Sequence, residues 1–124
     1  MSETMQLHTY SADKLLSCSH GEGIIELISG FKDGLFILDE PESALSPTSL
    51  LALNALIYEK AQKHRCQFII VTHNPILMAI TDSDFYWIGN GKVAKMDYKD
   101  SPHFSISKMF FENPSRMIEN LLKN

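Results

Sequence analysis

Two adjacent carboxylates, Asp39 and Glu40, directly follow the apolar run 35–38, and Pro41 comes next. Such a pair at the end of an apolar strand suits phosphoryl transfer beside a nucleotide. One carboxylate can hold Mg²⁺ through water, because Mg²⁺ prefers oxygen ligands and keeps part of its hydration shell. The other can orient or deprotonate an attacking water. The alternative is a strand that ends at the surface, with both acids solvated or capping the following turn.

A histidine, His73, ends a second apolar run, which has the sequence QFIIVTH at 67–73. Its imidazole can contact a γ-phosphate or polarise an attacking water. Alternatively, His73 makes hydrogen bonds within a turn and caps a helix that begins at Pro75.

The segment 19–23, SHGEG, places a small hydroxyl and two glycines at the start of a predicted helix. Backbone N–H groups at a helix start attract anions, and glycine lets a phosphate approach closely. The spacing of Ser19 and Glu22 is also that of a capping box, which is the alternative interpretation. The segment 43–46, SALS, is a polar turn in which Ser46 can cap the helix that Pro47 begins.

Hydrophobic periodicity and turn residues predict the elements that must position these groups. The predicted elements are a helix over about 20–31, a strand at 35–38, a helix at 48–64, a strand at 67–73, a short helix at 75–80, a hairpin at 85–97 with its turn at 89–91, and helices at 103–112 and 114–123.

This alternation of strands and helices predicts an α/β fold with a mostly parallel sheet, a C-terminal hairpin and closing helices. The strand at 35–38 is apolar on both faces, which suits a sheet that is covered on both sides. Right-handed crossovers place the carboxyl ends of the two strands on one edge, where ligands bind in open α/β sheets. We therefore expect Asp39, Glu40 and His73 to lie close together.

The composition of the 124 residues is that of one globular domain: 44% are hydrophobic and 21% are charged. The net charge is −4 and lysine and arginine do not cluster, so no footprint for nucleic acid is evident. The apolar runs are too short to span a membrane, and the N-terminal segment does not have the pattern of a signal peptide. We expect a cytoplasmic protein in which Cys18 and Cys66 are reduced thiols.

Taken together, four segments resemble the carboxyl-terminal half of an ABC-type ATPase domain. SHGEG at 19–23 looks like the signature motif, LFILDE at 35–40 like Walker B, SALS at 43–46 like the D-loop, and IIVTH at 69–73 like the switch-histidine strand. The likeness covers about residues 16–98. It is strongest to soluble P-loop ATPases that are labelled AAA-family and are akin to the Rad50/SMC and OLD nuclease groups. His20 replaces the first glycine of the usual signature, and Ser46 replaces the usual D-loop aspartate.

The resemblance implies a metal-binding role for Asp39 and catalytic roles for Glu40 and His73. Asp39 would support Mg²⁺, Glu40 would be the general base, and His73 would sense the γ-phosphate of ATP.

The resemblance also implies a partner, because two such domains meet head to tail with ATP between them. Ser19, His20, Gly21 and Glu22 would bind nucleotide, with Ser19 and Gly21 at the γ-phosphate of ATP held by a second subunit. Residues 43–46 would cross the interface.

A Walker A segment, G-x-x-x-x-G-K-[ST], does not occur in the sequence. Gly-Lys occurs once, at Gly91-Lys92, but Val93 follows and residue 86 is not glycine. We expect a single, incomplete domain over 1–124, truncated before Walker A and completed by its own missing N-terminal half or by a second ABC-type subunit. The strand at 67–72 is then expected to have an open edge.

Three interpretations of the whole chain follow. In the first, it is an ABC-type ATPase domain that turns over ATP only with a partner that carries a P-loop. In the second, it is a non-enzymatic interaction or regulatory module that docks on a related ATPase. The third, a metal-dependent hydrolase that uses Asp39, Glu40 and His73, has no further ligands to support it.

Overall fold

The computed structural model describes residues 20–123, and the backbone alone for residues 20–22. Ser19 and Cys18 therefore lie outside the described residues. The chain divides into two compact units, the first ending at Thr81 and the second beginning at Asp82. Each unit is described by itself.

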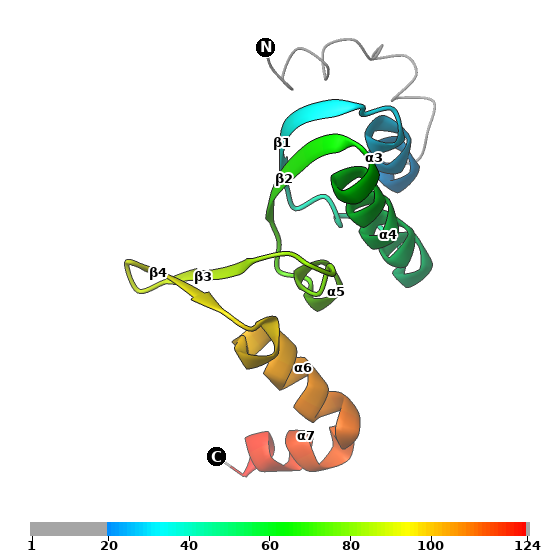
Figure 1. Cartoon of the computed structure of the whole chain (residues 1–124). Coiled ribbons are helices and arrows are strands. Elements are labelled where there is room, and N and C mark those ends of the chain that lie inside the picture. The colour runs from blue at the N-terminus through cyan, green and yellow to red at the C-terminus, as the bar shows by residue number, and fades with distance from the viewer. Residues whose placement is uncertain (1–19, 124) are drawn as a thin grey trace. The chain divides into compact units, whose positions relative to one another are not determined.

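The first unit is an α/β arrangement (Figure 1). Its elements are α3 (His20–Ser29), β1 (Asp33–Asp39), α4 (Pro47–Lys63), β2 (Arg65–Val71) and α5 (Pro75–Met78). Strands β1 and β2 are parallel and in register from Asp33 opposite Arg65 to Asp39 opposite Val71. The predicted helices and strands of this unit are confirmed, with shifts of a few residues at their ends.

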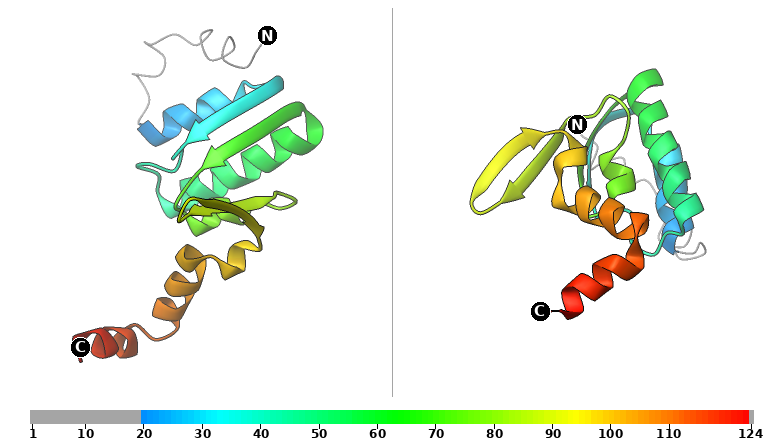
Figure 2. Two further views of the ribbon diagram at one scale, coloured as in Figure 1. Left: turned by 90° about the vertical axis from the view of Figure 1, so that its left-hand side faces the viewer. Right: turned by 90° about the horizontal axis from the view of Figure 1, so that it is seen from below.

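Helices α3 and α4 both cover the same face of the β1–β2 sheet (Figures 1 and 2). The hydrophobic core lies between these helices and the sheet, and the rings of Phe31 and Phe36 stack there with centroids 3.8 Å apart. The buried apolar side chains of this core are Ile28, Phe31, Phe36, Leu38, Leu50, Leu53, Ile57, Cys66, Leu77 and Ile80. This packing holds β1 and β2, and therefore the two strand ends where Asp39, Glu40 and His73 were predicted to meet, against the helices in the register of the sheet.

The opposite face of the sheet is not covered by a helix, so the expectation of a sheet covered on both sides is wrong for residues 20–123. Ile37 is 66% exposed, and Ile69 and Val71 are also exposed. Side chains alternate between the faces of a strand, so the residues next to buried Phe36 and Leu38 point away from the two helices. Within residues 20–123, β2 pairs with β1 alone. Its other edge is therefore unpaired, as predicted for the strand at 67–72.

Two local interactions anchor the ends of α4. The Ser46 hydroxyl accepts a hydrogen bond from the Ser49 N–H at 3.2 Å, which confirms the predicted cap before Pro47. At the other end, the buried Lys60 ammonium donates to the Phe31 carbonyl at 2.8 Å. A buried charge is tolerated when it is hydrogen-bonded in this way.

The second unit contains the predicted hairpin and closing helices. Its elements are β3 (Phe85–Gly89), β4 (Lys92–Met96), the short 3₁₀ helix η1 (Tyr98–Asp100), α6 (Pro102–Glu112) and α7 (Pro114–Leu122). The hairpin turns through Asn90 and Gly91 at φ of 52° and 73°, the left-handed conformation that two-residue hairpin turns require. Helix η1 was not predicted from the sequence; the Asp97 carboxylate caps it.

The predicted fold class, α/β with parallel strands, a hairpin and closing helices, is confirmed. That all 124 residues form one incomplete domain stays a prediction. No helix within residues 20–123 combines the length and the hydrophobicity needed to cross a membrane.

Candidate functional site

The candidate site lies where the two parallel strands end side by side. The register of the sheet finishes at Asp39 opposite Val71. One further bond continues it, because the Glu40 N–H donates to the Val71 carbonyl at 2.7 Å. Glu40 therefore lies next to the segment that begins at Thr72, which is the arrangement that the sequence predicted.

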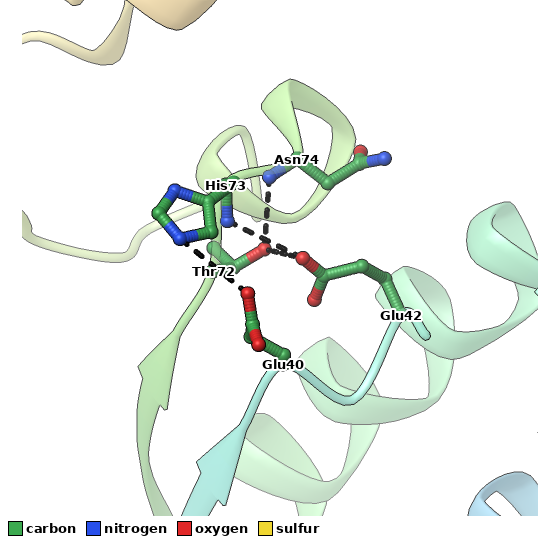
Figure 3. Close-up of polar contacts among 5 residues, drawn as sticks. All are labelled: Glu40, Glu42, Thr72, His73 and Asn74. Carbon is green, nitrogen blue, oxygen red and sulfur yellow. Dashed lines mark hydrogen bonds and ion pairs between the residues drawn. The ribbon is translucent and has the colours of Figure 1, made fainter. Parts of the chain in front are cut away.

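Glu40 and His73 are in contact across the two strand ends. Nε2 of His73 lies 3.4 Å from Oε1 of Glu40, and the side chains are 69% and 54% exposed. A contact between a carboxylate and an imidazole that is this exposed adds little to stability. The contact matters for its position, because it places a carboxylate and an imidazole together where solvent or a ligand can reach both (Figure 3). The predicted proximity is confirmed, while the catalytic roles of the two residues stay predictions.

The backbone of Glu40 is unusual. Its φ is 49°, in the left-handed region that residues with a side chain rarely adopt. The chain turns sharply here, with Pro41 buried behind it. Strained backbone of this kind costs of the order of 1 kcal/mol and is concentrated at functional sites.

A third acid, Glu42, belongs to the site and was missed by the sequence analysis. Its Oε2 accepts hydrogen bonds from the Thr72 hydroxyl at 2.7 Å and from the His73 N–H at 3.3 Å (Figure 3). The Thr72 hydroxyl in turn accepts from the Asn74 N–H at 3.0 Å. The signal available was an acid two residues beyond Glu40, after a proline that turns the chain back toward the neighbouring strand.

The segment after His73 is anchored from two sides. The Asn74 Oδ1 accepts a hydrogen bond from the Ile76 N–H at 2.8 Å as the cap of α5. The amide of Asn54, on α4, donates to the Ile76 carbonyl at 2.8 Å. The alternative role predicted for His73 was to cap the helix that begins at Pro75. In the structure the residue that caps this helix, α5, is Asn74.

Residues 43–46 form a turn stabilised by the two acids' backbones. The Ser43 N–H donates to the Glu40 carbonyl at 3.2 Å, and the Leu45 N–H donates to the Glu42 carbonyl at 3.0 Å. Ser43, Ala44 and Ser46 are exposed. The turn is therefore accessible to another chain, as an interface segment must be.

The other predicted site residues are placed less completely. Asp39 is exposed at the last position of β1. His20, Gly21 and Glu22 lie in the first turn of α3, and Ser19 lies outside the described residues. In the part of the chain that the structure describes, no three His, Cys, Asp or Glu residues group to hold a metal ion. The third interpretation, a hydrolase with a protein-ligated metal, gains no support from these residues.

A family model described as "AAA domain, putative AbiEii toxin, Type IV TA system" matches residues 15–79. This range spans the four motif-like segments and every predicted site residue. The match confirms the predicted likeness to AAA-labelled P-loop ATPases.

The fold is similar to that of a solved chain from work on the structural biochemistry of ATP-driven dimerization and DNA stimulated activation of SMC ATPases. The TM-score is 0.50 at 20% sequence identity, over 89% of this chain. The match spans 65% of that longer chain. The predicted SMC-like α/β fold is thereby confirmed.

Proposed function

We propose, from the membership of this chain in the AAA domain family described as putative AbiEii toxin, Type IV TA system, that it carries the base-bearing part of an ABC-type ATP hydrolase. The single observation that carries this proposal is the 3.4 Å contact between Glu40 and His73 at the ends of adjacent parallel strands. Ligands of open α/β sheets bind at this edge.

Glu40 is proposed as the general base. Its carboxylate is more than half exposed and can accept a proton from a water beside the strand ends. The left-handed backbone at φ 49° turns the residue out of the strand and supports a functional role. His73 is proposed to hold Glu40 on one side and to donate to a terminal phosphate oxygen on the other.

The residues present fit a hydrated Mg²⁺ ion. Asp39 offers an exposed carboxylate at the strand end, the type of ligand that binds Mg²⁺ through water. Bound MgATP would supply the phosphoanhydride bond and the cation that offsets its charge. Asp39 would hold the hydrated ion, and Glu40 would remain available to the attacking water.

The proposal includes a partner. The predicted signature residues, Ser19, His20, Gly21 and Glu22, would face ATP held by a second subunit, and the exposed turn at 43–46 would meet that subunit. The 124 residues contain no G-x-x-x-x-G-K-[ST] segment. The phosphate cradle is therefore proposed to come from outside them, in a related ATPase chain or a further part of the same protein.

The test is to purify the full chain, tagged, with the assembly it forms in its own cells and to measure phosphate release from MgATP. We expect Glu40→Gln to lower kcat by about 10²- to 10⁴-fold, while binding of a fluorescent ATP analogue is kept. Glu59→Gln is the matched control, since Glu59 is an exposed glutamate on α4 whose contact is to Lys63. Turnover that is unchanged by Glu40→Gln would refute the proposed base.

One observation favours a second candidate function, a non-enzymatic module that docks on a related ATPase. The uncovered face of the β1–β2 sheet presents Ile37, Ile69 and Val71 to solvent, and parallel sheets are normally covered on both faces. An assembly that forms but hydrolyses no ATP, and that Ile37→Glu dissociates, would favour this alternative.

A further inference from the structure

We infer that Glu42 is a positioning residue, whose carboxylate fixes the backbone of His73 so that the imidazole stays beside Glu40. The inference rests on the function proposed for Glu40 and His73. It assigns a role to a third acid that lies in neither the acid pair nor the turn at 43–46.

The geometry joins the two strand ends through one oxygen atom. Glu42 lies in the turn after β1. Its Oε2 accepts hydrogen bonds from the Thr72 hydroxyl at 2.7 Å and from the His73 N–H at 3.3 Å. Because the Thr72 hydroxyl also accepts from the Asn74 N–H, this oxygen organises three consecutive residues. Strand β2 ends at Val71, so these residues lie beyond the regular pairing of the sheet.

The contact between Glu40 and His73 cannot supply this order by itself. Both side chains are largely exposed, and exposed side-chain contacts of this kind hold their partners only weakly. Hydrogen bonds to a carboxylate that is partly withdrawn from water are stronger. The backbone of His73 is therefore restrained by Glu42, and its imidazole lies beside Glu40.

Stability alone does not account for Glu42. Its second oxygen, Oε1, is buried and has no hydrogen-bond partner among the described residues. An unsatisfied buried acceptor costs free energy, and such groups are uncommon in native proteins unless they serve a purpose. Removing the side chain should therefore loosen His73 more than it destabilises the first unit.

The first test uses the full chain alone and measures amide hydrogen exchange by NMR. Glu42→Ala should speed exchange of the His73 amide at least about tenfold, as loss of a charge-assisted hydrogen bond implies. Thr72→Val, which removes only the hydroxyl, should give a smaller increase at Asn74. Exchange at Leu53, in the core, is the internal reference. If neither variant changes exchange at residues 72–74, the inference is wrong.

The second test asks whether Glu42 acts through the pair. Glu40→Gln should shift the His73 ring resonances in the wild-type background, and this response should fall at least about threefold when Glu42 is alanine, because the imidazole is no longer held beside residue 40. A purely structural role predicts the same response in both backgrounds. Should Glu42→Ala fail to fold, Thr72→Val serves as the second background.

A kinetic test separates this inference from the proposed function. In the assembly that hydrolyses MgATP, Glu42→Ala should lower kcat about tenfold with KM unchanged, whereas Glu59→Ala should leave both unchanged. A wild-type assembly without turnover would refute the proposed function, and the exchange data would still decide the role of Glu42. Turnover that depends on Glu40 but not on Glu42 would refute the positioning role alone.

Discussion

The two compact units differ in how far their apolar side chains are buried. In residues 20–81, apolar residues from three helices, two strands and the segments between them form a buried core. In residues 82–123, none of the hydrophobic side chains is buried, and several large ones are exposed. The exposed large side chains of the second unit are Tyr86, Ile88, Val93, Ile106, Met109, Phe111, Ile118, Leu121 and Leu122.

The difference does not come from weaker local signals. Helix α4 begins with a serine cap and a proline, and α6 and α7 begin in the same way with Ser101-Pro102 and Asn113-Pro114. Caps and periodicity therefore define helices in both units, but within residues 20–123 only the helices of the first unit contribute to a buried apolar core. Hairpins and short helices without a core are marginal in water, so the second unit draws little stability from buried apolar side chains of its own.

The largest expected effect is a difference between two leucine truncations. Leu53 is 0% exposed in the core of the first unit, and Leu121 is 64% exposed on α7. Leu53→Ala should lower the free energy of unfolding by about 3 kcal/mol, through lost burial and a cavity. Leu121→Ala should change it by less than about 0.5 kcal/mol, as surface substitutions do. Urea unfolding followed by circular dichroism measures both.

The result for Leu121 can break the comparison. An effect as large as that of Leu53→Ala would mean that α7 is buried in solution, against a second copy or another chain. Repeating the unfolding at several protein concentrations distinguishes association from folding, because the stability of an associating protein depends on its concentration.

The elements of the first unit could be predicted from the sequence because each strand is a short apolar run that ends in polar residues, and the two runs follow the same pattern. Apolar runs that end in polar residues indicated β1 and β2. Because right-handed crossovers place the carboxyl ends of parallel strands on one edge of the sheet, Glu40 and His73 were expected to lie close together. Glu42 could not be found in this way. Its role depends on the turn at Pro41 and on a hydrogen bond to Thr72, 30 residues away, and neither follows from periodicity.

The covered and uncovered faces of the sheet show a second limit of the sequence. The run at 35–38 is apolar throughout, so it does not reveal which of its faces the helices cover. Phe36 and Leu38 are buried and Ile37 is exposed, a difference that arises only when α3 and α4 both pack on one side.

A smaller effect is expected from removing helix caps in the two units. Ser46 and Asn113 each accept a hydrogen bond from a backbone N–H three residues ahead, at 3.2 Å in both cases. Ser46→Ala should lower the free energy of unfolding by about 1 kcal/mol, because α4 carries much of the core. Asn113→Ala should leave the unfolding midpoint of the first unit unchanged and speed hydrogen exchange in α7 alone, because local opening does not require global unfolding. Equal effects on the midpoint would show that the two units unfold together.

The smallest expected effect is on pH dependence, and it concerns the thiol of Cys66. Burial is the main cause that raises the pKa of the Cys66 thiol; the nearby Lys60 charge lowers it in part, and Asp33 raises it further. The folded protein therefore holds this proton more tightly than the unfolded chain. The contribution to stability is complete below the unfolded-state pKa and is lost as the pH rises past 9.0 toward the folded value.

Alkylation rates of single thiols test this prediction and the comparison of the two units at once. In a Cys18→Ser background, Cys66 should react with iodoacetamide more slowly than a cysteine placed at exposed Ser115 on α7, because the thiolate is the reactive form. The gap should narrow as the pH rises above 9.0, where the buried thiol begins to ionise. Equal rates at neutral pH would show that the core around Cys66 opens as readily as the surface of α7, and the contrast between a packed first unit and an unpacked second unit would then be lost.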